Sequence, residues 1–546
     1  MSPFVRKVKT ASGATAVQIV EKRNGRRRIL EHVCSAHDET ELAVLLSAAQ
    51  QRVHGVQDEM LLVEQPRREP VGPIVEHASS EVLWRVLTDA YARLGFDQIN
   101  DEVFKALVTA RIIEPTSKQD TLRVLGDLGL PVPHLNTLYN CLRRCVERDY
   151  RSTIAASCWA HATARGPVAL VMYDLTTLHF EVTNEDRLRK VGMSKERRVD
   201  PQVTVGLLVT ADGFPLEVAL FEGNKAETKT LIPVIEQFKT RHGIKELVVV
   251  ADAGMLSADN LNGLEDAGCR FIVASRQSHV PYDLGDHFER HGNYTPDDST
   301  IETTRDMGTG RQRRTRRVVY HYSFKRHKRD DKTINAQVVK AEKVADGLRP
   351  VARDRFVTVT TDAAGKKAEV NWDVIERARF CAGFKGYVTN ISADVMDGAA
   401  VVAAYRDLWH VEESFRMAKG DLQARPIFHR KREPIEAHLT VVFAALAVAR
   451  HLQDQTGVSI KRLVQTLRPL QSVMITVAGQ PIQAQPRLTA EAEAILTPWS
   501  SGALNQARIV ELRSDSRLLV GEPCGPWRAK SMIWCESAIV PRLART

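Results

Sequence analysis

The chain contains few cysteines for its length, and their spacing does not form a metal-binding or disulfide pattern. Its 546 residues include 8 scattered cysteines, and no two of them form a Cys-x-x-Cys pair. Cys141 and Cys145 are one helical turn apart, but no pair of histidines follows them at the spacing of a zinc site. We therefore expect reduced thiols, as in cytosolic proteins.

Long hydrophobic runs are also missing. The first ten residues, MSPFVRKVKT, lack the apolar run of a signal peptide. The most apolar window, residues 439–449, is too short to span a bilayer. We expect a soluble, intracellular protein without a membrane partner.

Positive charge is in modest excess but is clustered along the chain. The formal net charge is +9 and the sequence pI is about 9.1. Lysines and arginines gather at residues 26–28, 195–198, 311–317 and 325–329. Such clusters are typical of proteins that bind a polyanion, although an ordinary solvated surface gives the same pattern.

The first third of the chain predicts two small units. Residues 4–34 alternate apolar and polar positions, which indicates antiparallel strands, and a helix with a tether follows. Four helices are then expected at 81–94, 101–111, 117–128 and 136–148. The last of them carries Arg143 and Arg144, which is compatible with a DNA-reading helix-turn-helix but equally with a plain helical bundle.

From Pro167 onward the pattern is that of an α/β fold with a mixed sheet. Buried strands are expected at 168–173, 203–210, 216–221, 247–250 and 271–274, with helices between the later ones. Residues 279–376 interrupt this pattern and predict a basic, β-rich insertion. Six segments follow from these changes: 1–66, a small β element and tether; 80–165, a helical DNA-binding domain; 166–278, the first half of the core; 279–376, the insertion; 377–455, the second half of the core; and 456–546, a C-terminal helical region and tail.

One stretch, residues 405–419, predicts a long amphipathic helix with two useful stripes. Apolar residues that step by threes and fours form a core-facing stripe, namely Leu408, Val411, Phe415, Ala418 and Leu422. A second stripe combines aromatic, acidic and basic residues, namely Tyr405, Trp409, Glu412, Arg416 and Lys419. Glu413 points about 100° away from Glu412 on a helix, so it lies off this second stripe and is expected nearer the outer side of the helix.

Three carboxylates fall where a folded site could collect them. Asp174 and Asp252 each follow a predicted buried strand, and Glu412 lies on the helix above. Acids at strand ends are exposed at the sheet edge, where ligands gather in open α/β sheets. Two or three such carboxylates favour Mg²⁺ or Mn²⁺, and two ions could promote displacement at a phosphodiester. Each aspartate taken singly is also compatible with a turn residue or a helix cap.

These residues resemble the motifs of the DDE transposases of bacterial insertion sequences, the IS-four type with a Tyr-x2-Arg-x3-Glu-x6-Lys signature. Tyr405, Glu412 and Lys419 match that spacing, and Asp252 with Gly254 resembles the second acidic motif. The resemblance covers roughly residues 80–455. It implies an RNase H-like core interrupted by a β-rich insertion, with Asp174, Asp252 and Glu412 as catalytic metal ligands.

The resemblance also implies a DNA substrate. A transposase of this type would bind the terminal inverted repeats of its element, cut the ends and join them to target DNA, working as a homodimer in the synapse. The signature arginine is replaced by Leu408, so Arg406 or Arg416 would contact the phosphate instead. Further DNA contacts are expected from Tyr405, Trp409, Lys419, Arg313, Arg314, Arg316 and Arg317. A nuclease or resolvase without strand transfer, and an inactive DNA-binding relic, remain open.

Overall fold

The computed structural model describes residues 3–499 apart from 11–12, 24, 62–73, 182–183, 194–198, 293, 352–353, 363–364 and 478–479. The basic cluster expected at 195–198 and the tail from residue 500 lie outside the described residues. The N-terminal unit is a three-stranded antiparallel sheet followed by one helix. Its elements are β1 (Phe4–Lys9), β2 (Thr15–Arg23), β3 (Arg26–Ala36) and α1 (Glu39–Leu61). Val17, Ile19, Ala49 and Val53 form a core of its own.

The helical segment has one more strand and one more helix than expected. Its elements are β4 (Ile74–Ser79), α2 (Glu81–Arg93), α3 (Glu102–Ile113), α4 (Lys118–Asp127), α5 (Leu135–Glu147) and α6 (Tyr150–Ala164). Asp101 caps α3 by accepting hydrogen bonds from the backbone N–H groups of Val103 and Phe104. These helices pack against α15 (Arg432–Thr456) in one continuous hydrophobic core with the sheet, so they are not an independent domain.

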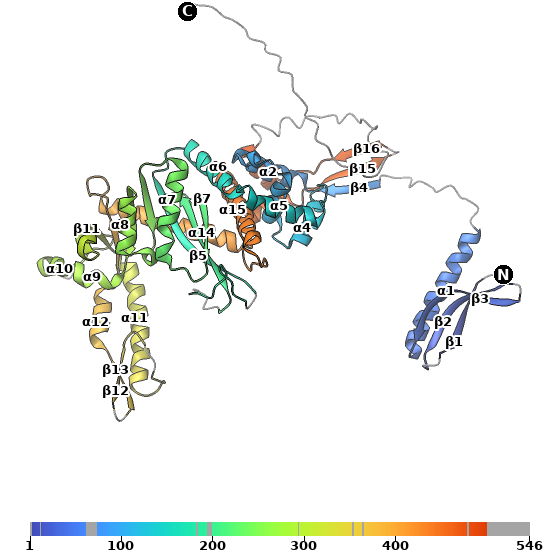
Figure 1. Ribbon diagram of the computed structural model, residues 1–546, viewed down its shortest axis with the longest axis horizontal. Helices are drawn as coiled ribbons and strands as arrows, with labels where there is room; N and C mark the ends of the chain where they lie inside the picture. The colour runs from blue at the N-terminus through green and yellow to red at the C-terminus, as the bar shows by residue number, and fades with distance from the viewer. Residues whose placement is uncertain are drawn as a thin grey trace, which may run out of the picture.

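An eight-stranded mixed sheet is the centre of the molecule (Figure 1). Its order is β10-β11-β14-β9-β8-β5-β6-β7. The strands are β5 (Leu170–His179), β6 (Gln202–Thr210), β7 (Pro215–Glu222), β8 (Leu247–Ala251), β9 (Cys269–Ser275), β10 (Thr300–Met307), β11 (Arg314–Tyr322) and β14 (Phe384–Thr389). Strands β5, β8 and β9 are parallel neighbours, and every other pairing in this sheet is antiparallel. The expected mixed α/β core is confirmed.

Strand β5 is longer than the sequence indicated. The strand was expected to end before Asp174. It continues to His179 because β6 pairs with it along this whole length, as far as the pair His179 with Gln202. The helices that connect the other core strands are α7 (Leu231–His242) and α8 (Ala258–Asp266).

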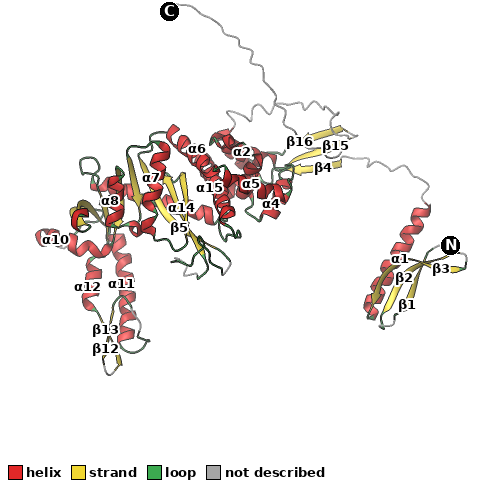
Figure 2. Ribbon diagram, viewed as in Figure 1, coloured by secondary structure: helices red, strands yellow, loops and turns green. Residues whose placement is uncertain are grey.

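The segment 279–376 differs from the expected β-rich insertion. Strands β10 and β11 belong to the central sheet, and α9 (Val280–Asp283) and α10 (Gly285–His291) precede them. What projects from the sheet is an arm of two helices with a short hairpin at its tip, which Figure 2 shows as mainly helical. The arm consists of α11 (Phe324–Ala345), β12 (Val357–Asp362), β13 (Gly365–Val370) and α12 (Trp372–Phe380). Ile334, Val338, Phe356 and Ile375 give the arm a small core.

The helix expected at 405–419 is broken in two. Helix α13 (Gly398–Arg406) ends before Asp407, and α14 (Trp409–Lys419) begins after Leu408. Backbone hydrogen bonds through the break span three residues instead of four, as in Leu408 N–H to the Tyr405 carbonyl. The core stripe itself is confirmed, since all five of its residues are buried.

The C-terminal part returns to the helical segment. Helix α15 is apolar and long enough to cross a membrane by composition, and 94% of its most apolar window is buried inside the fold. Beyond it lie α16 (Ile460–Leu467), β15 (Ser472–Val477), β16 (Gln480–Ala484) and α17 (Ala490–Leu496). Strand β15 pairs with β4, which ties the end of the described chain to the start of the helical segment.

Candidate active site

Asp174 and Asp252 are neighbours because of the register of two parallel strands. The last registered pair between β5 and β8 is Tyr173 with Ala251, so each aspartate is one residue past the same pair. Asp252 keeps an extended backbone, with φ −78° and ψ 166°. Side chains of adjacent strands at one register point to the same face. The two carboxylates therefore approach one another where β8 ends and β5 continues.

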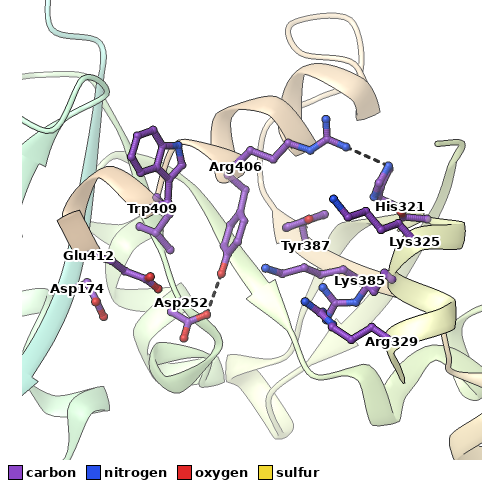
Figure 3. A pocket seen from close by; sticks show the side chains of 14 residues that line it. Asp174, Asp252, His321, Lys325, Arg329, Lys385, Tyr387, Arg406, Trp409 and Glu412 are labelled. Atoms are coloured by element: carbon purple, nitrogen blue, oxygen red, sulfur yellow. Dashed lines mark hydrogen bonds between the residues drawn. The ribbon is translucent and has the colours of Figure 1, made fainter. Parts of the chain in front are cut away.

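Glu412 joins them from α14. All three carboxylates line one open cavity of about 590 Å³ (Figure 3). Val411 and Phe415, on the adjacent face of α14, are buried in the core and fix the rotation of this helix. The structure thus brings together three acids that are 78 and 160 residues apart in the sequence.

The opposite wall of this cavity is basic. Its cationic and polar residues come from β11, the start of α11, β14 and α13, namely His321, Ser323, Lys325, Arg326, Arg329, Lys385 and Arg406. Burial lowers the pKa of Lys385, and the Arg326 charge lowers it further, while Asp252 and Glu412 oppose the shift. An acidic wall facing a basic wall is the electrostatic pattern expected where metal ions and a phosphate backbone meet.

Tyr405 links the two walls. Its hydroxyl donates a hydrogen bond to Oδ1 of Asp252 at 2.8 Å. The Lys385 ammonium lies 4.1 Å from the centre of the Tyr405 ring, and the Tyr387 ring packs at 4.8 Å. Burial and then the Asp252 charge raise the pKa of Tyr405, so the hydroxyl keeps its proton. We expected Tyr405 to contact DNA, but the side chain is 5% exposed and instead orients Asp252.

Glu413 faces a different part of the molecule. Its Oε2 accepts a hydrogen bond from Nη1 of Arg450 at 2.9 Å. Burial raises the pKa of Glu413, but the hydrogen bond and charge of Arg450 outweigh that effect and leave it below its usual range. The geometric choice of Glu412 over Glu413 agrees with this arrangement. We expected Glu413 to lie nearer the outer side of the helix. It is instead half-buried against Arg450.

The donor set of the cavity fits a hard divalent cation. Carboxylate oxygens are the preferred ligands of Mg²⁺ and Mn²⁺, and no thiol lines this cavity. Among the described residues, no group of three His, Cys, Asp or Glu could hold a metal ion as it stands. Asp174, Asp252 and Glu412 therefore share a cavity without forming a closed cage.

The other residues of the second stripe, and Arg406 beside it, lie at or beyond the rim of the cavity. Trp409 lines the cavity and is 53% exposed, with its ring packed at a tilt of 32° against His410. Arg416 is exposed on α14 and does not line the cavity. Lys419 lines a neighbouring cavity of about 500 Å³ along β5. Arg406 reaches the carboxylate cavity, and its Nη2 is 3.1 Å from Oδ1 of Asp298.

The arginines expected to contact DNA at residues 313–317 each pair with acidic groups of the protein. Arg316 is 2% exposed and donates hydrogen bonds to Glu265 and Asn262. Arg314 pairs with Glu265 and Asp266, Arg313 with Asp306, and Arg317 with Glu302. The three arginines of β11 hold this strand to its surroundings, whereas the side chain of Arg313 is 62% exposed. The expectation that Arg316 contacts DNA is wrong because it is buried.

The two arginines of the expected recognition helix also differ from one another. Arg144 holds Asp101 through Nε at 2.9 Å and Nη2 at 2.7 Å, so it joins α5 to the cap of α3. Arg143 is exposed and lies 3.6 Å from Glu147 on its own helix. Arg144 is therefore a structural residue, and Arg143 alone presents its charge to solvent.

Sequence reasoning missed Lys385, His321 and Tyr387 as cavity residues. Each lies on a strand whose place in the sheet depends on distant partners, so no local pattern marks it. The cluster at 325–329 was visible in the sequence, and Lys325, Arg326 and Arg329 do line the cavity.

The fold and the cavity define a mixed α/β protein with three gathered carboxylates beside a basic wall. Residues 181–448 match the family of the transposase DDE domain, a range that includes Asp252 and Glu412 and begins just after Asp174. No curated protein matches the chain. Similar solved structures include the cryo-EM piggyBac transposase synaptic complex with hairpin DNA. It is 9% identical over 83% of this chain and 88% of that chain, with a TM-score of 0.36. The family match supports a DDE transposase.

Proposed function

We propose that this protein is a DNA transposase of a bacterial insertion sequence that cuts the ends of its element and joins them to target DNA. The observation that carries the proposal is the meeting of Asp174, Asp252 and Glu412 in one cavity. The match of residues 181–448 to the transposase DDE domain supports it independently.

The central sheet supports an RNase H-like core in this proposal. Strands β7, β6, β5, β8 and β9 are consecutive neighbours, with an antiparallel meander leading into parallel strands. This arrangement places Asp174 on β5 and Asp252 directly after the end of the parallel strand β8, at the middle of the sheet. Strands β14, β11 and β10 then extend the sheet and bring the basic wall to the same cavity.

Asp174, Asp252 and Glu412 would hold two Mg²⁺ or Mn²⁺ ions. When bound, such ions lower the barrier for attack of a water or a 3′-hydroxyl on a phosphodiester and stabilise the leaving oxygen. Tyr405 orients Asp252 through its hydroxyl, and Lys385 offers positive charge between the acids and the basic wall. Lys325, Arg326 and Arg329 would hold the phosphates of the DNA strand that enters the cavity.

The DNA partner would be duplex DNA carrying the terminal inverted repeats, and later the target. Two copies of the chain would hold the two ends together in a synapse. Trp409 at the rim offers an aromatic face on which a base at the cut end could stack. A protein with this role would work at the nucleoid in the cytoplasm.

Incubating the full chain with duplexes that carry the ends of its own element tests the proposal. With Mg²⁺ or Mn²⁺ we expect nicks mapped to the end nucleotide, and joining of a pre-cut end to a second duplex. Cutting without joining would instead indicate a nuclease or resolvase. Binding without metal-dependent cutting by the unaltered chain would indicate an inactive relic.

A further inference from the structure

The N-terminal sheet has one face covered by α1 and one face free of any described element. Val5, Val17, Ile19 and Val33 lie on the covered face, where they pack with the apolar residues of α1. Arg52 of α1 pairs with Glu31 of β3, which fixes Glu31 on that same side. Side chains alternate between the faces of a strand, so the register assigns the remaining residues.

Positive charge is concentrated in the strands and negative charge in the helix. The three strands contain eight lysines or arginines and two glutamates, whereas α1 contains four acids and one arginine. Both glutamates of the strands, Glu21 and Glu31, share the side of Ile19 and thus face α1. In the described strands, the open face therefore carries no carboxylate.

Cross-strand rows on the open face combine hydrogen-bonding groups with apolar ones. Arg6, Gln18 and His32 form one row through the pairs Arg6 with Gln18 and Gln18 with His32. Phe4, Val20 and Ile29 form the next row in the same way. Phe4 and Ile29 are 41% and 53% exposed, whereas Val20 between them is fully buried, so the two outer residues supply the apolar contacts of this row. Lys22 pairs with Arg27 at the end of the sheet.

We propose that this open face of β1, β2 and β3 binds duplex DNA by entering its major groove. The major groove admits a β-ribbon, and strands are an established means of reading base edges there. Arginine and glutamine are the side chains that pair with guanine and adenine edges, and apolar groups contact the thymine methyl. Lys22 and Arg27 then hold the phosphates at the groove edge. Of the two arginines expected to read DNA from α5, only Arg143 faces solvent, because Arg144 is held by Asp101. The open face offers more cations and base-reading side chains than α5, so we assign the reading to the face.

This inference rests on the proposed function for the identity of the DNA, which is the end of the element. The test uses the full chain without divalent metal, so that binding is measured apart from cutting. Two duplexes of equal length serve as probes, one with the end sequence and one with that sequence scrambled. Fluorescence anisotropy at several salt concentrations gives the affinity for each.

Two matched double variants separate the faces. Arg6→Ala with Arg27→Ala removes two cations from the open face, and Lys7→Ala with Lys9→Ala removes two exposed cations from the side of α1. We expect the first to weaken end binding roughly tenfold or more and to lower the salt slope by about 2. The variant Lys7→Ala with Lys9→Ala should change the end affinity and the salt slope by much less. Gln18→Ala should reduce the preference for the end over the scrambled duplex, since it removes a base contact without removing charge.

The outcomes of this test are distinguishable from those of the proposed function. Equal effects of the two double variants, or no effect of either, would overturn the inference even if the chain cuts and joins its ends. If the unaltered chain prefers neither duplex, the variant Arg6→Ala with Arg27→Ala should still bind the scrambled duplex more weakly than the variant Lys7→Ala with Lys9→Ala. A chain that binds single-stranded RNA better than either duplex would also overturn it. Unchanged circular dichroism of each variant excludes misfolding as the cause.

Discussion

Glu413 is joined to Arg450 at 2.9 Å, whereas its neighbour Glu412 lines the cavity with the two aspartates. Arg450, whose side chain is 5% exposed, also donates a hydrogen bond from Nη2 to the carbonyl of Asp212 at 2.6 Å. Gly213 lies next to that contact at φ +84°, and an added Cβ there would come within 2.7 Å of Arg450. Adjacent glutamates thus serve two purposes, one lining the carboxylate cavity and one holding α14 and α15 to the β6–β7 hairpin.

Substituting each of these two glutamates by glutamine should impair different properties, cleavage in one case and stability in the other. Glu412→Gln keeps the shape but removes the charge that would hold a metal, so cutting and joining should fall by at least a thousandfold, about 4 kcal/mol, with end binding retained. Glu413→Gln leaves Arg450 buried without its anion, which should cost about 3 kcal/mol of stability. Single-turnover cleavage and thermal unfolding of both variants check this. Normal cleavage by Glu412→Gln in Mg²⁺ would contradict the assignment.

Removing one oxygen from Tyr405 should slow the chemistry without weakening DNA binding. In Tyr405→Phe, Asp252 loses the hydrogen bond that orients it, and we expect a loss of about tenfold in cleavage rate, since one hydrogen bond to a charged group contributes about 1.5 kcal/mol. Tyr139→Phe, at an exposed tyrosine of α5, is the control. Reduced end affinity with an unchanged rate would show that Tyr405 contacts DNA after all.

How much the sequence could predict depended on how local each feature is. The stripe of Leu408, Val411 and Phe415 follows from helical periodicity alone, and it correctly oriented Glu412. The break at Asp407 carries no glycine or proline, so the sequence offered no signal for it. The extension of β5 past Asp174 depends on the partner β6, which a single-strand pattern does not contain.

Charged clusters show the same limit more clearly. Residues 311–317 and 325–329 are equally basic in the sequence, yet Arg316 is buried against Glu265 while Lys325 lines the cavity. The difference is set by acids about 50 residues away on α8. Arg326 and Arg329 also have an acid nearby, Asp330 of their own helix at 3.5 and 3.9 Å, yet both still line the cavity. A cluster of cations therefore predicts DNA contact only where the fold places those cations at the cavity.

That contrast gives a salt-dependence prediction. Changing Lys325, Arg326 and Arg329 together to glutamine should weaken binding of pre-cut ends and lower the salt slope by roughly 2 to 3, because phosphate contacts release counterions. Arg313→Gln should leave the slope unchanged, since its partner is Asp306 on the neighbouring strand. Affinities measured between low and high salt decide the matter. A flatter slope for Arg313→Gln with no change in the triple variant would reverse the assignment of the two clusters.

Lys118 provides a test of stability against pH. It is 8% exposed, and the charged or titratable groups acting on it include Arg111, His429 and His438, with no ion pair to an acid among the described residues. Burial, followed by the charge of Arg111, lowers the pKa of Lys118 from its ordinary 10.5 to about 7. Between these two values the unfolded chain holds a proton that the folded chain lacks, so this group makes stability rise with pH across that window. Below pH 7 the cost of burying the charge is present in full.

Lys118→Met should therefore stabilise the protein, by an amount on the order of 2 kcal/mol near pH 6.5 and less near pH 9.5. Methionine is similar in length and fills the same space without charge. Thermal unfolding midpoints at the two pH values measure the effect, with Lys461→Met, at an exposed lysine of α16, as the control. A midpoint that falls in Lys118→Met at both pH values would show that an anion neutralises Lys118 in the folded protein. The same fall in phosphate buffer but not in its absence would identify that anion as one supplied by the solution.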